Sequence, residues 1–161
     1  MTVLSHVITK IEEFLMAVLM ALLTILMVAA VIFRYFIRDP ITWAGEVSIF
    51  LLIWTSFIGG SWGLKYGTQA SVTFLMDALT SKNKRRLIII QYIIMILFLF
   101  ILLYYTYQWM ALPSTMLQKS SSLQLPMWIP YSAVPVGLTF ATIHLISRLI
   151  ESIKKKGDHI T

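Results

Sequence analysis

Four long apolar segments dominate the pattern of hydrophobic and polar positions along the chain. They cover residues 11–33, 41–64, 87–112 and 128–149 and are separated by polar stretches. A helix needs about 20 mostly apolar residues to cross a bilayer, so each segment predicts one membrane-spanning helix. The sequence therefore predicts an all-α integral membrane protein in which residues 1–161 form a single domain of four transmembrane helices.

Local signals at the segment ends predict where the helices begin. Thr9 and Glu12 have the spacing of a capping box, which is typical of a helix start, while residues 1–8 either extend this helix or lie along the membrane surface. Asp39 followed by Pro40 predicts the start of the second helix, because aspartate is a good cap and proline is favoured at the first helical position. The short link between these spans predicts a tight antiparallel hairpin. Pro135 predicts a kink early in the fourth helix, since proline has no backbone N–H to donate.

The long link 65–86 between the second and third segments contains four apolar residues at helical spacing. These residues are Val72, Leu75, Met76 and Leu79. The spacing i, i+3, i+4, i+7 indicates a short amphipathic helix that lies in the membrane interface. An ordinary loop rich in turns is the alternative interpretation of this link.

The composition excludes a soluble domain. Hydrophobic residues make up 58% of the chain and charged residues 12%, whereas soluble domains contain about 45–50% and about 25%. The net charge of +6 does not indicate a nucleic-acid partner, because the basic residues are grouped beside apolar segments instead of following a polar face. Membrane lipid is therefore the expected surrounding of most of the surface.

Lysine and arginine are unequally divided between the two sides of the predicted helices. One side holds ten of them, namely Lys10, Lys65, Lys82, Lys84, Arg85, Arg86, Arg148, Lys154, Lys155 and Lys156. The other side holds Arg34, Arg38 and Lys119. Because basic residues collect on the cytoplasmic side of a membrane, both termini and the 65–86 link are predicted to be cytoplasmic. The 34–40 and 113–127 links are then predicted to face outward.

Few residues within the spans are able to carry chemistry. The chain has no cysteine, so thiolate metal sites and iron–sulfur clusters are excluded. His144 is the one histidine within a span, which excludes bis-histidine haem ligation. Glu12 and Glu13 are placed at a helix start, which leaves Glu46 as the one acidic residue expected inside a span. The sequence therefore predicts no catalytic residue, cofactor or metal site, and hence no enzyme.

Glu46 has two interpretations. It follows the predicted cap of the second helix by about two turns, near the outer interface, where Arg34 closes the preceding helix. The structural interpretation is an ion pair between Glu46 and Arg34 or Arg38 that holds the hairpin together. The functional interpretation is a contact with a partner protein or an ion path, because acidic residues inside a membrane are costly and mark function by default.

One side of the second span carries a stripe of mostly small residues. Its members are Gly45, Ser48, Leu52, Ser56, Gly59, Gly63 and Gly67, at spacings of three and four. In lipid, such a stripe lets another helix approach closely. The stripe is therefore predicted to be a packing surface, together with Trp43 at the start of the span, and its neighbour is either a helix of the same chain or another subunit.

The order of several short motifs resembles the small membrane subunit, of the DctQ type, of tripartite ATP-independent periplasmic (TRAP) transporters. The matching features in the first half are Arg34-Tyr35, Trp43, Glu46, Trp54, Gly59 and Gly67. In the second half they are Leu125-Pro126-Met127-Trp128, Tyr131 and Pro135-Val136-Gly137. Members of the family often carry a histidine and an aspartate where this sequence has Gln69 and Thr73, so no role is assigned to those two residues.

The resemblance implies a non-catalytic subunit without cofactors in the bacterial inner membrane. It implies a large permease subunit as partner, which moves an organic acid of the C4-dicarboxylate or sialic acid type with sodium, and a periplasmic binding protein that delivers it. The small subunit would then enlarge the static scaffold of the permease. Arg38 and Lys119 are the expected docking residues for the binding protein. The alternatives are a self-sufficient small four-helix transporter and a membrane assembly factor without a transport role.

Overall fold

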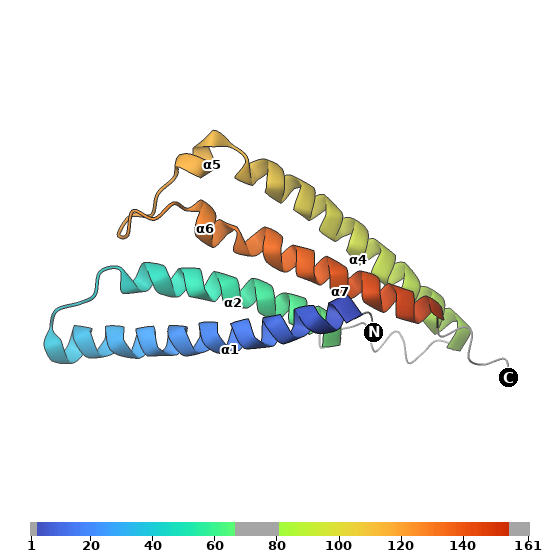
Figure 1. Ribbon diagram of the computed structural model, residues 1–161, viewed down its shortest axis with the longest axis horizontal. Coiled ribbons are helices and arrows are strands. Elements are labelled where there is room, and N and C mark those ends of the chain that lie inside the picture. Colours follow the sequence, from blue (N-terminus) through green and yellow to red (C-terminus); the bar gives the residue numbers. More distant parts are fainter. Residues whose placement is uncertain (1–2, 67–80, 155–161) are drawn as a thin grey trace.

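The computed structural model describes residues 3–66 and 81–154, with the backbone alone at residues 3–4 and 81–85. The predicted amphipathic helix over 72–79 lies outside the described residues, as do Gly67, Gln69 and Thr73. Figure 1 shows the arrangement of the described helices and the position of the two termini.

Four long helices are long and apolar enough to cross a membrane, which confirms the predicted fold class. They are α1 (Val3–Ile32), α2 (Ala44–Tyr66), α4 (Ser81–Met110) and α7 (Ala133–Lys154). A π-helical turn, η1 (Phe33–Ile37), extends α1, and two short helices, α5 (Pro113–Leu117) and α6 (Trp128–Tyr131), lie between α4 and α7. The orientation of these helices in the membrane stays a prediction.

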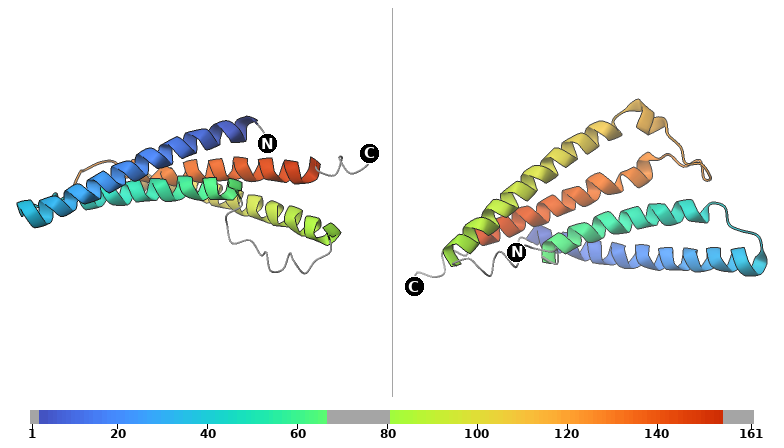
Figure 2. Two further views of the ribbon diagram at one scale, coloured as in Figure 1. Left: turned by 90° about the horizontal axis from the view of Figure 1, so that it is seen from below. Right: turned by 180° about the vertical axis from the view of Figure 1, so that it is seen from behind.

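The four long helices form an open layer. Helix α1 packs on α2, α2 packs on α7, and α7 packs on α4, whereas α1 and α4 lie at opposite edges. The helices converge toward the end of the layer that carries the termini and spread apart at the other end (Figures 1 and 2). The helices therefore do not surround a common axis, and both faces of the layer remain available to lipid or protein.

Helix α7 is the central element because small residues let it approach α2 very closely. Ala133, Gly137 and Ala141 follow each other at every fourth position and are all buried. A Cβ atom placed on Gly137 would lie 2.7 Å from Cβ and 2.8 Å from the backbone oxygen of Phe57. Small residues at this spacing allow close helix packing in membranes, so this seam sets the separation of α2 and α7.

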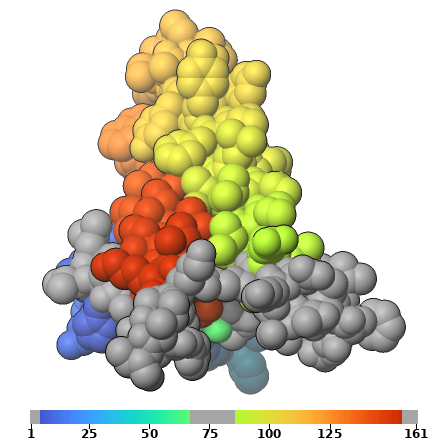
Figure 3. Space-filling model, turned by 90° about the vertical axis from the view of Figure 1, so that its right-hand side faces the viewer, coloured from blue at the N-terminus to red at the C-terminus, as the bar shows by residue number. Residues whose placement is uncertain are grey.

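The other side of α7 packs on α4 through larger apolar residues. Leu99 of α4 and Ala141 and Leu145 of α7 form a buried cluster, which Tyr92 and Leu138 help to cover. The space-filling view of the terminus end shows α4 and α7 in direct contact (Figure 3). Helix α7 thus packs on both sides, on α2 through small residues and on α4 through larger apolar ones.

The capping-box start at Thr9 is wrong, because residues 3–8 extend the first helix, and the predicted start of the second helix is wrong as well. Helix α1 begins at Val3, so Thr9 lies inside it, and its hydroxyl donates to the Ser5 carbonyl 2.7 Å away in the way typical of threonine within a helix. Helix α2 begins at Ala44, after Asp39-Pro40. Arg38 takes a left-handed conformation with a φ of 60°, and the N–H groups of Arg38 and Asp39 donate to the Phe33 carbonyl. Asp39 therefore helps to close the preceding helix instead of opening the next one.

The fourth span is interrupted close to Pro135, where the sequence predicts a kink. Helices α6 and α7 are separated at Ser132, three residues before the proline. The N–H of Ser132 donates to the Trp128 carbonyl and that of Val136 to the Ser132 carbonyl, at 2.9 Å and 3.2 Å. Pro135 has no N–H and therefore donates no hydrogen bond to the carbonyl of Tyr131, four residues earlier. The helical hydrogen-bond pattern is interrupted between α6 and α7.

The seam between α2 and α7 leads to a first prediction. In the variant Gly137→Leu, the added side chain meets the Phe57 backbone, so the helices must move apart at a cost of about 1–3 kcal/mol. Unfolding of the purified chain in mixed micelles by added SDS, followed by circular dichroism, measures this loss. Gly60→Leu is the matched control, because a Cβ on Gly60 meets nothing within 4 Å. Equal stability of the two variants would contradict the assignment of this seam.

Candidate functional site

Two groups of polar contacts hold the layer together, one at each end. Along α1, Glu12 and Arg34 are separated by about 33 Å at 1.5 Å per residue, which is close to the roughly 30 Å thickness of the hydrocarbon core. Glu12 belongs to the group at the end that carries the termini, and Arg34 lies at the opposite end. Each group is therefore placed near one boundary of the membrane, with an apolar layer between them.

The group at the terminus end is centred on a buried pair between α1 and α7. His144 Nε2 donates to Glu12 Oε2 at 2.9 Å, and His144 Nδ1 hydrogen-bonds Ser5 Oγ at 2.8 Å. The side chains of Glu12 and His144 are both fully buried. We call this group the terminus cluster. Its members are Ser5, Thr9, Glu12, Lys65, His144 and Arg148.

Helix α2 joins the terminus cluster through Lys65. Its ammonium group is buried and donates to the Ser5 carbonyl at 3.2 Å and to the Thr9 hydroxyl. The guanidinium of Arg148 on α7 donates in turn to the Lys65 carbonyl, with its Nε at 2.7 Å. The cluster therefore connects α1, α2 and α7 at one level, and it combines the acidic Glu12 with the basic Lys65 and Arg148.

The terminus cluster corrects the expectation that Glu46 is the one acidic residue inside a span. Glu12 lies in the third turn of α1, within the apolar segment Ser5–Ile37, because the helix begins at Val3. His144, which the sequence presents as isolated, is its partner. A signal was present, since Ser5, Thr9 and Glu12 fall on one helical face at i, i+4 and i+7. Placing the helix start at Thr9 concealed that stripe.

Glu13, the neighbour of Glu12, has a different environment. It is exposed, and its Oε1 atom accepts from Trp62 Nε1 at 3.2 Å and from the Tyr66 hydroxyl at 3.4 Å. These contacts join α1 to α2 on the surface of the layer. The two adjacent glutamates thus form one buried and one exposed connection, which makes Glu13 a suitable comparison for Glu12.

At the opposite end, Glu46 holds the link between α5 and α6. Its carboxylate accepts from the backbone N–H groups of Ser121 at 2.7 Å, Ser122 at 3.1 Å and Leu123 at 3.2 Å. The predicted ion pair with Arg34 or Arg38 is therefore wrong. Three convergent N–H groups satisfy a carboxylate as well as an arginine does, and Glu46 also lies in the first turn of α2, where negative charge is favourable.

The link that Glu46 holds is a small, ordered hairpin, which we call the outer hairpin (118–127). Ser120 N–H donates to the Leu125 carbonyl at 2.8 Å and Met127 N–H to the Gln118 carbonyl at 2.9 Å. Gln124 turns the chain with a φ of 54°. Lys119 lies exposed in this hairpin, where it forms an isolated β-bridge with Pro126, so its charge is presented on a structured surface.

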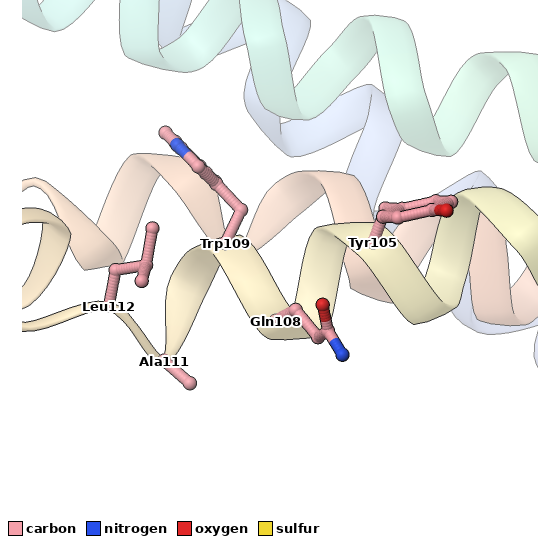
Figure 4. Close-up of a pocket in the computed structure, with 5 residues that line it drawn as sticks. All are labelled: Tyr105, Gln108, Trp109, Ala111 and Leu112. Atoms are coloured by element: carbon pink, nitrogen blue, oxygen red, sulfur yellow. The ribbon is translucent and has the colours of Figure 1, made fainter.

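Aromatic residues at the end of α4 fix the outer hairpin from the other side. The rings of Trp109 and Tyr131 lie 4.8 Å apart, and the Tyr131 hydroxyl donates to Gln118 at 3.3 Å. Figure 4 shows Tyr105, Trp109 and Leu112 directed to one side of the chain and Gln108 and Ala111 to the other. Together these five residues line an open hollow of about 490 Å³, which is a surface feature and not an enclosed cavity.

The predicted small-residue stripe of α2 is only partly used within the chain. A Cβ on Gly59 would lie 3.6 Å from Met16 Sδ of α1, whereas Gly45 has nothing within 4 Å. Ser56 is exposed and Gly63 is half-buried. The buried side of α2 is instead formed by Ala44, Ile58, Ser61 and Lys65. The stripe thus contacts α1 at Ser48 and Gly59 and leaves Gly45 and Ser56 open.

The basic residues and the tryptophan predicted for the outer end lie on the surface. Arg34, Arg38 and Trp43 are exposed, and among the described residues neither arginine has an ion-pair partner. The described residues also contain no group of three or more side chains able to hold a metal ion. The polar contacts of the described residues therefore join helices and loops to one another.

Comparisons with known proteins agree on one family. The family model for the DctQ component of tripartite ATP-independent periplasmic transporters matches residues 23–155. The C4-dicarboxylate TRAP transporter small permease protein DctQ of Vibrio cholerae is 27% identical over 174 residues, which cover 94% of this chain and 75% of that protein. The ectoine TRAP transporter small permease protein TeaB of Halomonas elongata is 24% identical, with 98% and 82% covered. A putative TRAP transporter small permease protein of Haemophilus influenzae is 27% identical, with 93% and 92% covered.

The terminus cluster leads to a second prediction. Glu12→Ala leaves His144 buried without its acidic partner, which is expected to destabilise the chain by about 3–5 kcal/mol. Glu13→Ala, at the exposed neighbour, is expected to cost less than about 1 kcal/mol. The SDS unfolding assay measures both losses, and the double variant Glu12→Ala/His144→Ala measures the coupling energy. Equal losses for the two glutamate variants, or additive effects of the Glu12 and His144 variants, would contradict the role of the pair.

Proposed function

The chain belongs to the family of DctQ components of tripartite ATP-independent periplasmic transporters, and we propose that it acts as the fixed membrane scaffold of such a transporter. The members of this family that resemble it are small permease subunits, which are not enzymes. In this proposal the chain binds a large permease subunit in the bacterial inner membrane, with both of its own termini on the cytoplasmic side.

The open layer is the observation that carries this proposal. A self-sufficient transporter needs helices that enclose a path for its substrate, whereas α1 and α4 lie at opposite edges with α2 and α7 between them. Charged groups in the membrane mark substrate and ion pathways. Here, Glu12, Lys65 and Glu46 are all engaged in contacts between helices or with a loop. This arrangement favours a supporting role over a self-sufficient transporter.

Substrate recognition and ion coupling are assigned to the partners. We propose that the large subunit moves an organic acid of the C4-dicarboxylate or sialic acid type and couples the movement to sodium. One relative is named for C4-dicarboxylates and another for ectoine, so small subunits of similar sequence occur with different substrates. The substrate is therefore expected to depend on the chains that this subunit joins.

The outer hairpin supports a second part of the proposal, a docking surface for a periplasmic binding protein. Glu46, Trp109 and Tyr131 hold this hairpin in place. Lys119 and Arg38 are exposed at the same end of the layer. Fixed, exposed cations steer an acidic partner and raise its association rate, so these two residues are the proposed docking charges.

Co-expression with the large permease subunit tests the scaffold proposal. The full chain is expected to co-purify with that subunit, and vesicles that contain both are expected to take up substrate in the presence of the binding protein. Vesicles that contain this chain alone are expected to take up none. Transport by the chain alone, or failure to co-purify with any large permease, would contradict the proposal.

Charge reversal tests the docking surface. Lys119→Glu and Arg38→Glu are each expected to raise the binding-protein concentration needed for half-maximal transport by about fivefold, while co-purification with the large subunit is unchanged. Glu46→Gln is expected to act in the same direction, because it loosens the outer hairpin. Lys10→Glu, exposed at the opposite end, is the matched control. Transport curves that coincide for all four variants would count against this surface.

A further inference from the structure

A groove runs between the end of α1 and the beginning of α2, at the outer end of the first hairpin. It has a volume of about 280 Å³. Its walls are formed by Met27, Ala30, Val31, Arg34, Tyr35, Pro40, Ile41, Ala44 and Gly45. The first four of these residues share one face of α1 and extend for about 10 Å along the helix.

Small residues keep the groove open. Ala30, Ala44 and Gly45 line it where longer side chains would close the space between the two helices. A Cβ atom on Gly45 would meet nothing within 4 Å. At the inner end, Ser48 Oγ lies 3.3 Å from Met27 Sδ and joins the two helices. The groove is therefore closed toward the membrane interior and open toward the outer boundary.

The groove combines an apolar wall with one uncompensated cation at its mouth. Met27, Val31 and Ile41 supply apolar surface, whereas Arg34 supplies the charge. In the described part of the chain Arg34 has no acidic partner. Along the helix, Arg34 lies about 33 Å from Glu12, which is close to the thickness of the hydrocarbon core. Because Glu12 lies near one boundary of the membrane, Arg34 lies near the other, at the level of the lipid headgroups. An anionic headgroup joined to an acyl chain matches both features.

We propose that this groove binds one anionic phospholipid. Its phosphate accepts hydrogen bonds from the Arg34 guanidinium, and part of one acyl chain lies along Met27 and Val31. Ligand pockets in proteins occupy about 300–1,000 Å³, so this groove holds one chain segment and not a whole lipid. A free phosphate would leave the apolar wall uncovered, and a soluble anionic peptide would not reach a wall that lies within the membrane.

The test is native mass spectrometry of the full chain taken from vesicles of phosphatidylglycerol and phosphatidylcholine. Under detergent washing that strips loosely held lipid, the chain is expected to retain one phosphatidylglycerol in preference to phosphatidylcholine. Arg34→Gln removes the charge, and Gly45→Leu fills the groove. Each is expected to lower retention by about fivefold, the effect of one basic contact to an anionic lipid.

Matched controls separate this site from general effects on the chain. Arg38→Gln removes an exposed charge that does not line the groove, and Gly60→Leu adds the same side chain to α2 where space is also open. Both are expected to retain lipid as the unaltered chain does. Circular dichroism identifies any variant that fails to fold, and the arginine pair then decides the test alone.

Four outcomes would overturn the proposal. The first is equal retention in all variants, and the second is equal loss in test and control variants. The third is unchanged lipid retention while Arg34→Gln or Gly45→Leu fails to co-purify with the large permease subunit, which would identify the groove as a protein contact. Displacement of the retained lipid by inorganic phosphate would also overturn it, because the acyl chain would then contribute nothing.

Discussion

The buried contact between Glu12 and His144 is the interaction on which the layer depends most. Both side chains are fully buried, and burying a polar group is costly unless it hydrogen-bonds within the protein. Helices α1 and α7 make few other contacts because α2 lies between them. A carboxylate and an imidazole at 2.9 Å therefore specify where the first helix crosses the layer, which apolar packing alone would not do.

The two ends of the layer solve the same problem with different chemistry. At the terminus end, side chains from three helices contact one another and nearby backbone carbonyls, while Glu12 Oε1 is buried without a hydrogen-bond partner among the described residues. At the outer end, Glu46 is satisfied by backbone N–H groups of the outer hairpin, at 2.7–3.2 Å. A backbone donor set depends on loop conformation and not on a particular partner residue, so the sequence around 121–123 need not contain a basic side chain.

The hydropathy pattern predicted the four spanning helices because membrane length and apolar composition leave few alternatives. It did not predict the contacts that join them. The missed pair of Glu12 and His144 lies 132 residues apart in sequence, and one wrong helix start hid the polar face of α1. The small residues of α2 were predicted to form the packing surface, whereas the tight contact between α2 and α7 occurs at Gly137. Ala133 and Ala141 lie four residues to either side of Gly137, and this repeat of small residues indicated close packing of α7.

An open layer is stable in a bilayer for a reason that also limits how it recognises a partner. Lipid chains are as apolar as the exposed faces of α1 and α4, so covering these faces with protein gains no hydrophobic free energy. A partner must instead be preferred to lipid by shape and by polar contacts. Open positions such as Gly60 and Ser56 admit close approach, and among the described residues charges lie exposed only near the two boundaries. Recognition of a large subunit is therefore expected to combine a small-residue surface in the membrane with polar contacts at its edges.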